Sequence, residues 1–82
     1  MIKYFLIFNL SLEGDYKNFY KQLERLRAVK VLDSIYCIKY RDFKTNELLQ
    51  FFQKFLGKND GLLVVKSSLW VGKNLIETPN GL

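Results

Sequence analysis

The chain has no histidine and only one cysteine, Cys37, among its 82 residues. One cysteine cannot form an internal disulfide, and without histidine a zinc site of the cysteine–histidine type cannot be built. A general base near neutral pH would need a strongly shifted Asp, Glu or Lys, because histidine is absent. Cys37 lies in a run of β-forming residues, which is typical of a small buried hydrophobic residue. The sequence therefore predicts no cofactor, no metal site and no catalytic residue.

Glycine and proline are also scarce, with five and one copies. Gly57, Gly61 and Gly72 do not match any spaced phosphate-binding motif. The apolar start, Met1–Phe8, is too short to span a bilayer and is not followed by a small-residue cleavage site. We expect it to be a buried strand of a cytoplasmic protein that has no membrane partner.

Acidic residues are fewer than basic ones, 8 against 13, which gives a formal net charge of +5. This balance permits a nucleic acid or an acidic protein as partner, although it also serves solubility. The aromatic share of 16% supplies material for a core. A chain of this length forms one domain, residues 1–82, and leaves much apolar surface that a second copy would cover.

The first half of the chain predicts a strand, a helix and two short strands. Residues 2–10 are almost continuously apolar, which is typical of a central strand. After Asp15, a plausible N-cap, apolar residues recur at helical spacing up to Leu26. Residues 28–40 are rich in β-formers and are interrupted by Asp33-Ser34, which predicts two strands joined by a tight turn.

The second half predicts a helix, a strand and a tail. Thr45 caps the predicted helix, its apolar residues continue to Leu56, and Gly57 stops it. A turn over residues 59–61 precedes a short buried strand over residues 62–65. The tail, residues 66–82, is irregular, and we expect it to add an edge strand or to pack on a partner protomer.

This order of elements predicts an α+β fold of the ferredoxin-like β-α-β-β-α-β type. Such a fold has an antiparallel four-stranded sheet with both helices on one face. Right-handed crossovers leave the first strand in the centre, as its apolar run requires. The other face would carry Tyr and Ile side chains, and a homodimer through that face would cover them.

Several short motifs carry a resemblance to a known group. They are Met1-Ile2-Lys3-Tyr4, Ile7-Phe8-Asn9-Leu10, Leu32-Asp33-Ser34-Ile35-Tyr36, Asn59-Asp60-Gly61-Leu62-Leu63-Val64-Val65 and Trp70 followed by Asn74-Leu75-Ile76. Across nearly the whole length the chain resembles the small ferredoxin-like subunit of the CRISPR adaptation complex and the SinR-like and VapD-like proteins. The resemblance implies a ferredoxin-like homodimer with a role in bacterial or phage defence, or in counter-defence.

The resemblance also bears on catalysis. In that superfamily an Asp ends the first strand, lies near the dimer axis and is implicated in metal-dependent nuclease activity. A pair of carboxylates can hold Mg²⁺ and activate water. The matching residue here is Asn9. An amide is a neutral and weaker ligand, so the departure favours a non-catalytic protein.

We therefore expect a non-catalytic homodimeric module that binds a protein or a nucleic acid. A metal-dependent endoribonuclease using other carboxylates, such as Asp33 or Asp60, and a purely structural accessory dimer are the alternatives. The predicted phosphate contacts are Lys17, Lys21, Arg25, Arg27, Arg41 and Lys44. The predicted dimer contacts are Asn9, Tyr36, Ile38, Trp70 and Leu75.

Overall fold

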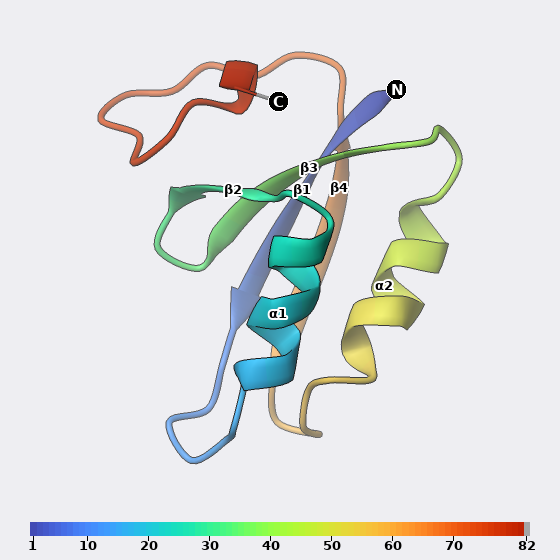
Figure 1. Cartoon of the computed structure of the whole chain (residues 1–82), viewed down its shortest axis with the longest axis vertical. Coiled ribbons are helices and arrows are strands. Elements are labelled where there is room, and N and C mark those ends of the chain that lie inside the picture. The colour runs from blue at the N-terminus through green and yellow to red at the C-terminus, as the bar shows by residue number, and fades with distance from the viewer. Residues whose placement is uncertain (82) are drawn as a thin grey trace.

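The computed structural model describes residues 1–81 of the chain (Figure 1). The elements are β1 (Ile2–Asn9), α1 (Lys17–Arg25), β2 (Val29–Leu32), β3 (Ile35–Tyr40), α2 (Thr45–Gln53), β4 (Gly61–Ser67) and a 3₁₀ turn, η1 (Pro79–Gly81). The predicted order of strands and helices is confirmed, as is the tight turn at Asp33-Ser34 between β2 and β3. Leu82, which belongs to the predicted tail, lies outside the described residues.

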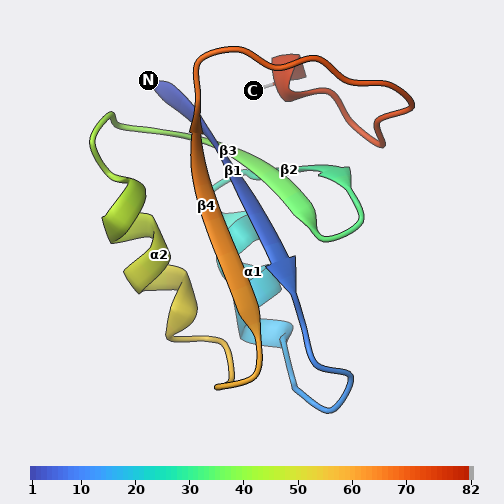
Figure 2. The ribbon, with the colours of Figure 1, turned by 180° about the vertical axis from the view of Figure 1, so that it is seen from behind.

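The four strands form one antiparallel sheet in the order β2-β3-β1-β4. In each β-α-β unit, one strand of the other unit lies between the two strands, which is the split arrangement of a ferredoxin-like fold. Both helices lie on the same face of the sheet, in front of it in Figure 1 and behind it in Figure 2. The predicted fold class and the central place of β1 are confirmed.

Alternation along β1 explains how the core forms. Tyr4, Leu6 and Phe8 are buried beneath the helices, whereas Phe5 and Ile7 lie on the opposite face, called here the open face. The helices add their own buried side chains, Phe19 and Leu23 from α1 and Leu48 and Phe52 from α2. The main core cluster therefore lies in one layer between the sheet and the helix pair.

Aromatic rings join the two helices to the sheet. The Phe19 ring meets Phe8 at 5.0 Å between centroids and Phe52 at 5.8 Å, both edge to face. Edge-to-face geometry is favoured because the positive edge of one ring meets the negative face of the other. Phe19 thus connects β1 to α2 through α1, which gives a short chain a compact core.

The ends of the helices differ from the expectation in detail. The N-cap position of α1 is Tyr16, and Asp15 accepts a hydrogen bond from the Lys17 amide at 3.1 Å through Oδ1. The second helix ends at Gln53, before the predicted end at Leu56, and continues as tight turns. Gly57 does not adopt a positive φ, so it is not the left-handed stop that the sequence suggested.

The segment after β4 crosses from the end of β4 to the β2 side of the sheet (Figure 2). The Ile76 amide donates to the Val31 carbonyl at 2.9 Å, and Pro79 is buried. Trp70 and Leu75 lie over Phe5, Ile7, Val31 and Ile35, around a small hollow of ≈ 190 Å³. The tail therefore covers the β2 and β3 side of the open face. A contact between the tail and a partner protomer stays a prediction.

The expectation that Ile38 and Tyr36 lie on the open face is wrong. Ile38 is fully buried in the core under the helices, and the Tyr36 ring stacks on Phe8 at 5.8 Å on that same face. Cys37 alternates with them and lies on the open face beside Phe5, its partner in the register, where it is completely buried. This bears out the interpretation of Cys37 as a buried hydrophobic residue.

This core makes a prediction for two matched leucines. Leu23 is 1% exposed and Leu12 is fully exposed. We expect Leu23→Ala to lower the free energy of unfolding by about 2–5 kcal/mol, because it removes buried methyl groups and leaves a cavity. Leu12→Ala should change it by less than about 0.5 kcal/mol. Urea unfolding followed by circular dichroism measures both, and equal losses would contradict the described core.

Candidate functional site

The outer side of α1 carries a row of positive charges. Lys17, Lys21 and Arg25 are all exposed, whereas Phe19 and Leu23 on the inner side are buried. Side chains four residues apart share one side of an α-helix. At 1.5 Å per residue, the row is about 12 Å long. These three residues are called the basic stripe, and all of them are among the predicted phosphate contacts.

Other lysines hold the ion pairs of the described residues. The pairs are Lys30 with Asp33 at 3.5 Å, Lys44 with Glu47 at 3.5 Å and Lys66 with Asp42 at 2.8 Å. Within residues 1–81 the basic stripe has no carboxylate in an ion pair with it, so its charges remain available to an anion. Lys44, also predicted as a phosphate contact, is partly neutralised by Glu47.

Two further cations lie near the end of α1. Arg27 follows the helix with a positive φ of 58° and is exposed. Arg41 follows β3, and its guanidinium lies 5.7 Å from the centroid of the Tyr40 ring. Leu26 and Tyr40 line the same small hollow, so the segments that carry Arg27 and Arg41 approach each other. The predicted basic residues therefore extend from the stripe toward the connection between β3 and α2.

A buried tyrosine holds that connection. The Tyr4 hydroxyl donates to the Arg41 carbonyl at 2.7 Å and accepts from the Lys44 amide at 3.2 Å. Asp42 accepts a hydrogen bond from Lys66, which lowers the pKa of Asp42 and raises that of Lys66. These contacts hold the backbone segment from which the Arg41 and Lys44 side chains extend. No sequence pattern indicated these contacts.

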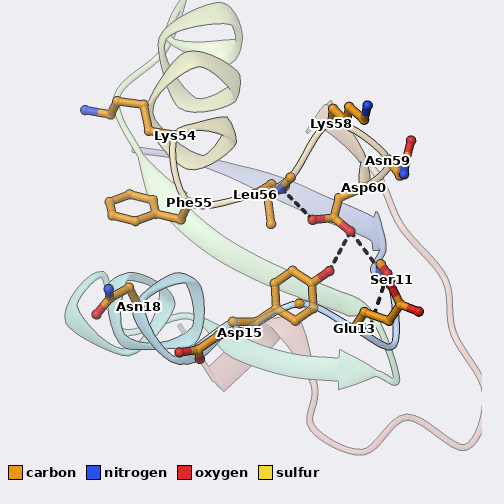
Figure 3. A pocket seen from close by; sticks show the side chains of 13 residues that line it. Ser11, Glu13, Asp15, Asn18, Lys54, Phe55, Leu56, Lys58, Asn59 and Asp60 are labelled. Atoms are coloured by element: carbon orange, nitrogen blue, oxygen red, sulfur yellow. Dashed lines mark hydrogen bonds between the residues drawn. The ribbon is translucent and has the colours of Figure 1, made fainter.

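A second candidate site is a hollow of ≈ 530 Å³ between the β1–α1 loop and the segment that joins α2 to β4 (Figure 3). Asp60 lies at its centre. It accepts hydrogen bonds from the Tyr16 hydroxyl at 2.6 Å, the Gly57 amide at 2.6 Å and the Ser11 amide at 2.8 Å. These four residues are called the Asp60 cluster.

The Asp60 cluster is a structural connection between two loops. The bond from Tyr16 is the main cause that holds the pKa of Asp60 below its ordinary value, followed by the bonds from the two amides. The same bond raises the pKa of Tyr16. Both carboxylate oxygens of Asp60 accept hydrogen bonds, so they are already engaged. The turn residues around Asp60 indicated a local role, and no pattern pointed to Tyr16, 44 residues away.

The carboxylates do not gather into a metal centre in the part of the chain that the structure describes. Asp33 lies in the exposed β2–β3 turn, paired with Lys30, and Asp60 belongs to the Asp60 cluster. Asn9 is exposed at the end of β1, opposite Gly61 of β4. It is on the open face because it continues the alternation of Phe5 and Ile7.

The remaining predicted dimer contacts are distributed over both sides of the sheet. Trp70 and Leu75 are half-buried against the open face of their own chain. Tyr36 and Ile38 belong to the helix side, so the structure does not bring the five residues together in one patch. On the open face, β4 leaves Leu63 56% and Val65 39% exposed, and Leu32 of β2, which lines the hollow under the tail, is also 39% exposed.

No protein-family model matches the chain, and none of the curated proteins compared with it matches. Among residues 1–81, the helices are too short and not apolar enough for any of them to cross a membrane.

The Asp60 cluster predicts an acid-dependent loss of stability. Asp60→Asn replaces one acceptor oxygen by an amino group, so it should lower the melting temperature at neutral pH. Because folding lowers the pKa of Asp60, its contribution is present above the unfolded pKa of about 4 and disappears as pH falls through the folded value. The difference between wild type and Asp60→Asn should therefore shrink below about pH 4.

Tyr16→Phe should lower the melting temperature at neutral pH for the same reason. Since folding raises the pKa of Tyr16 and lowers that of Asp60, this difference should be present between about pH 4 and pH 10. It should shrink below this range as Asp60 is protonated and disappear above it as Tyr16 ionises. Asp33→Asn is the matched control for Asp60→Asn. Asp33 forms only an exposed ion pair with Lys30, and such pairs contribute little to stability. A pH-independent difference for Asp60→Asn in thermal unfolding would contradict the assigned role.

Proposed function

We propose that the protein is a non-catalytic homodimeric module that binds the phosphate backbone of a nucleic acid with the outer side of α1. The basic stripe is the observation that carries this proposal. Its three cations are exposed, are aligned and make no ion pair within residues 1–81. Lysine and arginine in such a row neutralise phosphates and release their counterions.

The spacing of the stripe suits a sugar–phosphate backbone. A row of about 12 Å covers about three to four nucleotide steps at 3.4 Å of helix axis per phosphate of one strand. Arg27 and Arg41 extend the positive surface beyond the helix. Contacts of this kind determine affinity and orientation rather than sequence preference. The proposed binding is therefore insensitive to sequence and strongly sensitive to salt.

The homodimer is part of the proposal because β4 leaves apolar side chains on the surface. Leu63 and Val65 are neighbours on one face of β4 and are exposed. Burying such side chains contributes about 25 cal/mol per Å² of apolar area. On the basis of the resemblance to the CRISPR adaptation subunit, we propose that this dimer acts in the cytoplasm, in defence or counter-defence.

The test is light scattering and binding to a short duplex over a salt series. We expect wild-type protein to bind at low salt with a steep dependence of log K on log salt. The triple variant Lys17→Ala, Lys21→Ala, Arg25→Ala should bind more weakly, and its slope should fall by about 0.9 for each phosphate that the variant no longer neutralises.

The control is the triple variant Lys54→Ala, Lys58→Ala, Lys73→Ala, which removes the same formal charge elsewhere. It should keep a slope close to that of wild type. Equal losses of affinity in both variants would mean that net charge, and not the stripe, determines binding. If the wild-type protein binds no nucleic acid at any salt concentration, the nucleic-acid proposal is wrong, and an acidic protein becomes the partner to test.

A further inference from the structure

The two edges of the sheet are protected very differently. At the β2 edge the strand has only four residues, and its pairing with β3 is irregular between Lys30 and Leu32. The Ile76 amide of the tail also donates a hydrogen bond to the Val31 carbonyl there. Short length, an irregular register and a covering segment are the devices by which proteins prevent an edge strand from pairing with another chain.

Within the described residues, the β4 edge has none of these devices. It is seven residues long, pairs with β1 without a register shift and contains no proline. Its only charge is Lys66, and charged lysines normally discourage edge pairing. Here the Lys66 ammonium is bound to Asp42 at 2.8 Å and lies 5.3 Å from the Phe43 ring centroid. That charge is therefore neutralised within the chain.

The direction of the free backbone groups follows from one hydrogen bond. The Phe8 amide donates to the Ser34 carbonyl at 3.0 Å, so Phe8 points its backbone groups toward the β3 side. The direction of the N–H and C=O groups alternates along a strand. The backbone groups of Ile7 therefore point toward β4, where they pair with those of Leu63, its partner in the register. The next residues of β4 point the other way. Leu62, Val64 and Lys66 therefore present their N–H and C=O groups outward, at the free edge.

A partly apolar groove accompanies this edge on the helix side. Two hollows of ≈ 330 and ≈ 490 Å³ lie between α2 and β4, and both are lined by Leu49 and Leu62. Val64 lines the first, whereas the second has Leu56 together with the polar side chains of Gln53, Lys58 and Asp60. A strand added to β4 would place every second side chain in this groove, and the part of the groove beside Val64 favours an apolar side chain.

We propose that the β4 edge is the docking site for β4 of a second copy of this chain. The two strands pair antiparallel about Val64, so that Val64 of one copy faces Val64 of the other. Leu62 then faces Lys66, and each facing pair exchanges both backbone hydrogen bonds. This proposal rests on the homodimer of the proposed function and names where the second copy joins.

The chemistry of β4 identifies a second copy as the occupant. The chain carries a net charge of +5, so two copies repel each other except where the surface is neutral. Residues 61–65 carry no charge, and Lys66 is paired internally. In this register Val64 of the second strand supplies an apolar side chain beside Val64, whereas its Lys66 lies beside Leu62, near the hollow that Asp60 lines. The same outward-facing residues form the contact on both strands, as an interface with two-fold symmetry requires.

One experiment compares Lys66→Pro with Lys66→Ala by light scattering and circular dichroism. Both variants lose the ion pair with Asp42, but only proline loses the outward N–H and blocks the edge. Proline is tolerated on an edge strand where the N–H faces away from the sheet. We expect wild type and Lys66→Ala to be dimers. Lys66→Pro should be a folded monomer whose dissociation constant is raised at least about tenfold, because each copy loses one hydrogen bond across the contact.

A second experiment tests the register, and it stands even if the proline variant fails to fold. Under mild oxidation Val64→Cys should form a disulfide-linked dimer, because the two residues face each other across the axis. Leu62→Cys should not, since Leu62 of one copy lies far from Leu62 of the other. Native Cys37 does not interfere, because it is fully buried, and burial raises the pKa of its thiol.

The outcomes separate this inference from the proposed function. A dimer that persists in Lys66→Pro, or that links equally through both cysteine positions, would overturn the β4 contact while leaving the homodimer. Pairing of β4 with the tail of the second copy, or with a foreign strand, would leave Val64→Cys unlinked and would also overturn it. A monomeric wild type would overturn both the β4 contact and the homodimer, whereas the salt series still tests the basic stripe.

Discussion

Two helices can cover only one face of a four-stranded sheet, and this constraint shapes the rest of the molecule. Tyr4, Leu6 and Phe8 of β1 belong to the covered face, where the helices complete a layered core. On the open face, the tail shields β2 and β3, and its Ile76 amide also occupies the β2 edge. Among the described strands, β4 remains without cover, both on the open face and along its edge. The tail therefore determines which strand of the open face is left uncovered.

The fold was predictable because its signals are local and repeated. The apolar run of β1, the helical spacing after Asp15 and the turn at Asp33-Ser34 each describe a nearby stretch of chain, and their order selects the topology. The orientation of β3 was not predictable from its sequence. Residues 35–40 alternate two apolar sets, so either set suits the core, and a one-residue choice exchanges the faces. Ile38 and Tyr36 were placed on the wrong side for that reason.

The candidate sites divide in the same way. The basic stripe depends on a four-residue step within one helix, so each of its members was predictable from the sequence. The Asp60 cluster depends on residues brought together from two loops by the whole fold, and no local pattern connects Asp60 to Tyr16. The Tyr4 hydroxyl, which holds the Arg41 and Lys44 backbone, is a similar long-range contact. Sequence patterns reveal surfaces made by one element, and they miss sites made by several.

The proposed β4 contact and the basic stripe have a common geometric consequence. Antiparallel pairing of two identical edge strands creates a two-fold axis perpendicular to the sheet, so the helices of both copies lie on the same side. Helix α2 lies beside β4, whereas α1 lies nearer the middle of the sheet (Figure 1). The two α2 helices then flank the axis and the two basic stripes lie farther out. A long polyanion that crosses this helix layer meets both stripes, while a short one reaches a single stripe. Dimer formation would thus raise affinity mainly for nucleic acid long enough to span both copies, since the second contact is intramolecular.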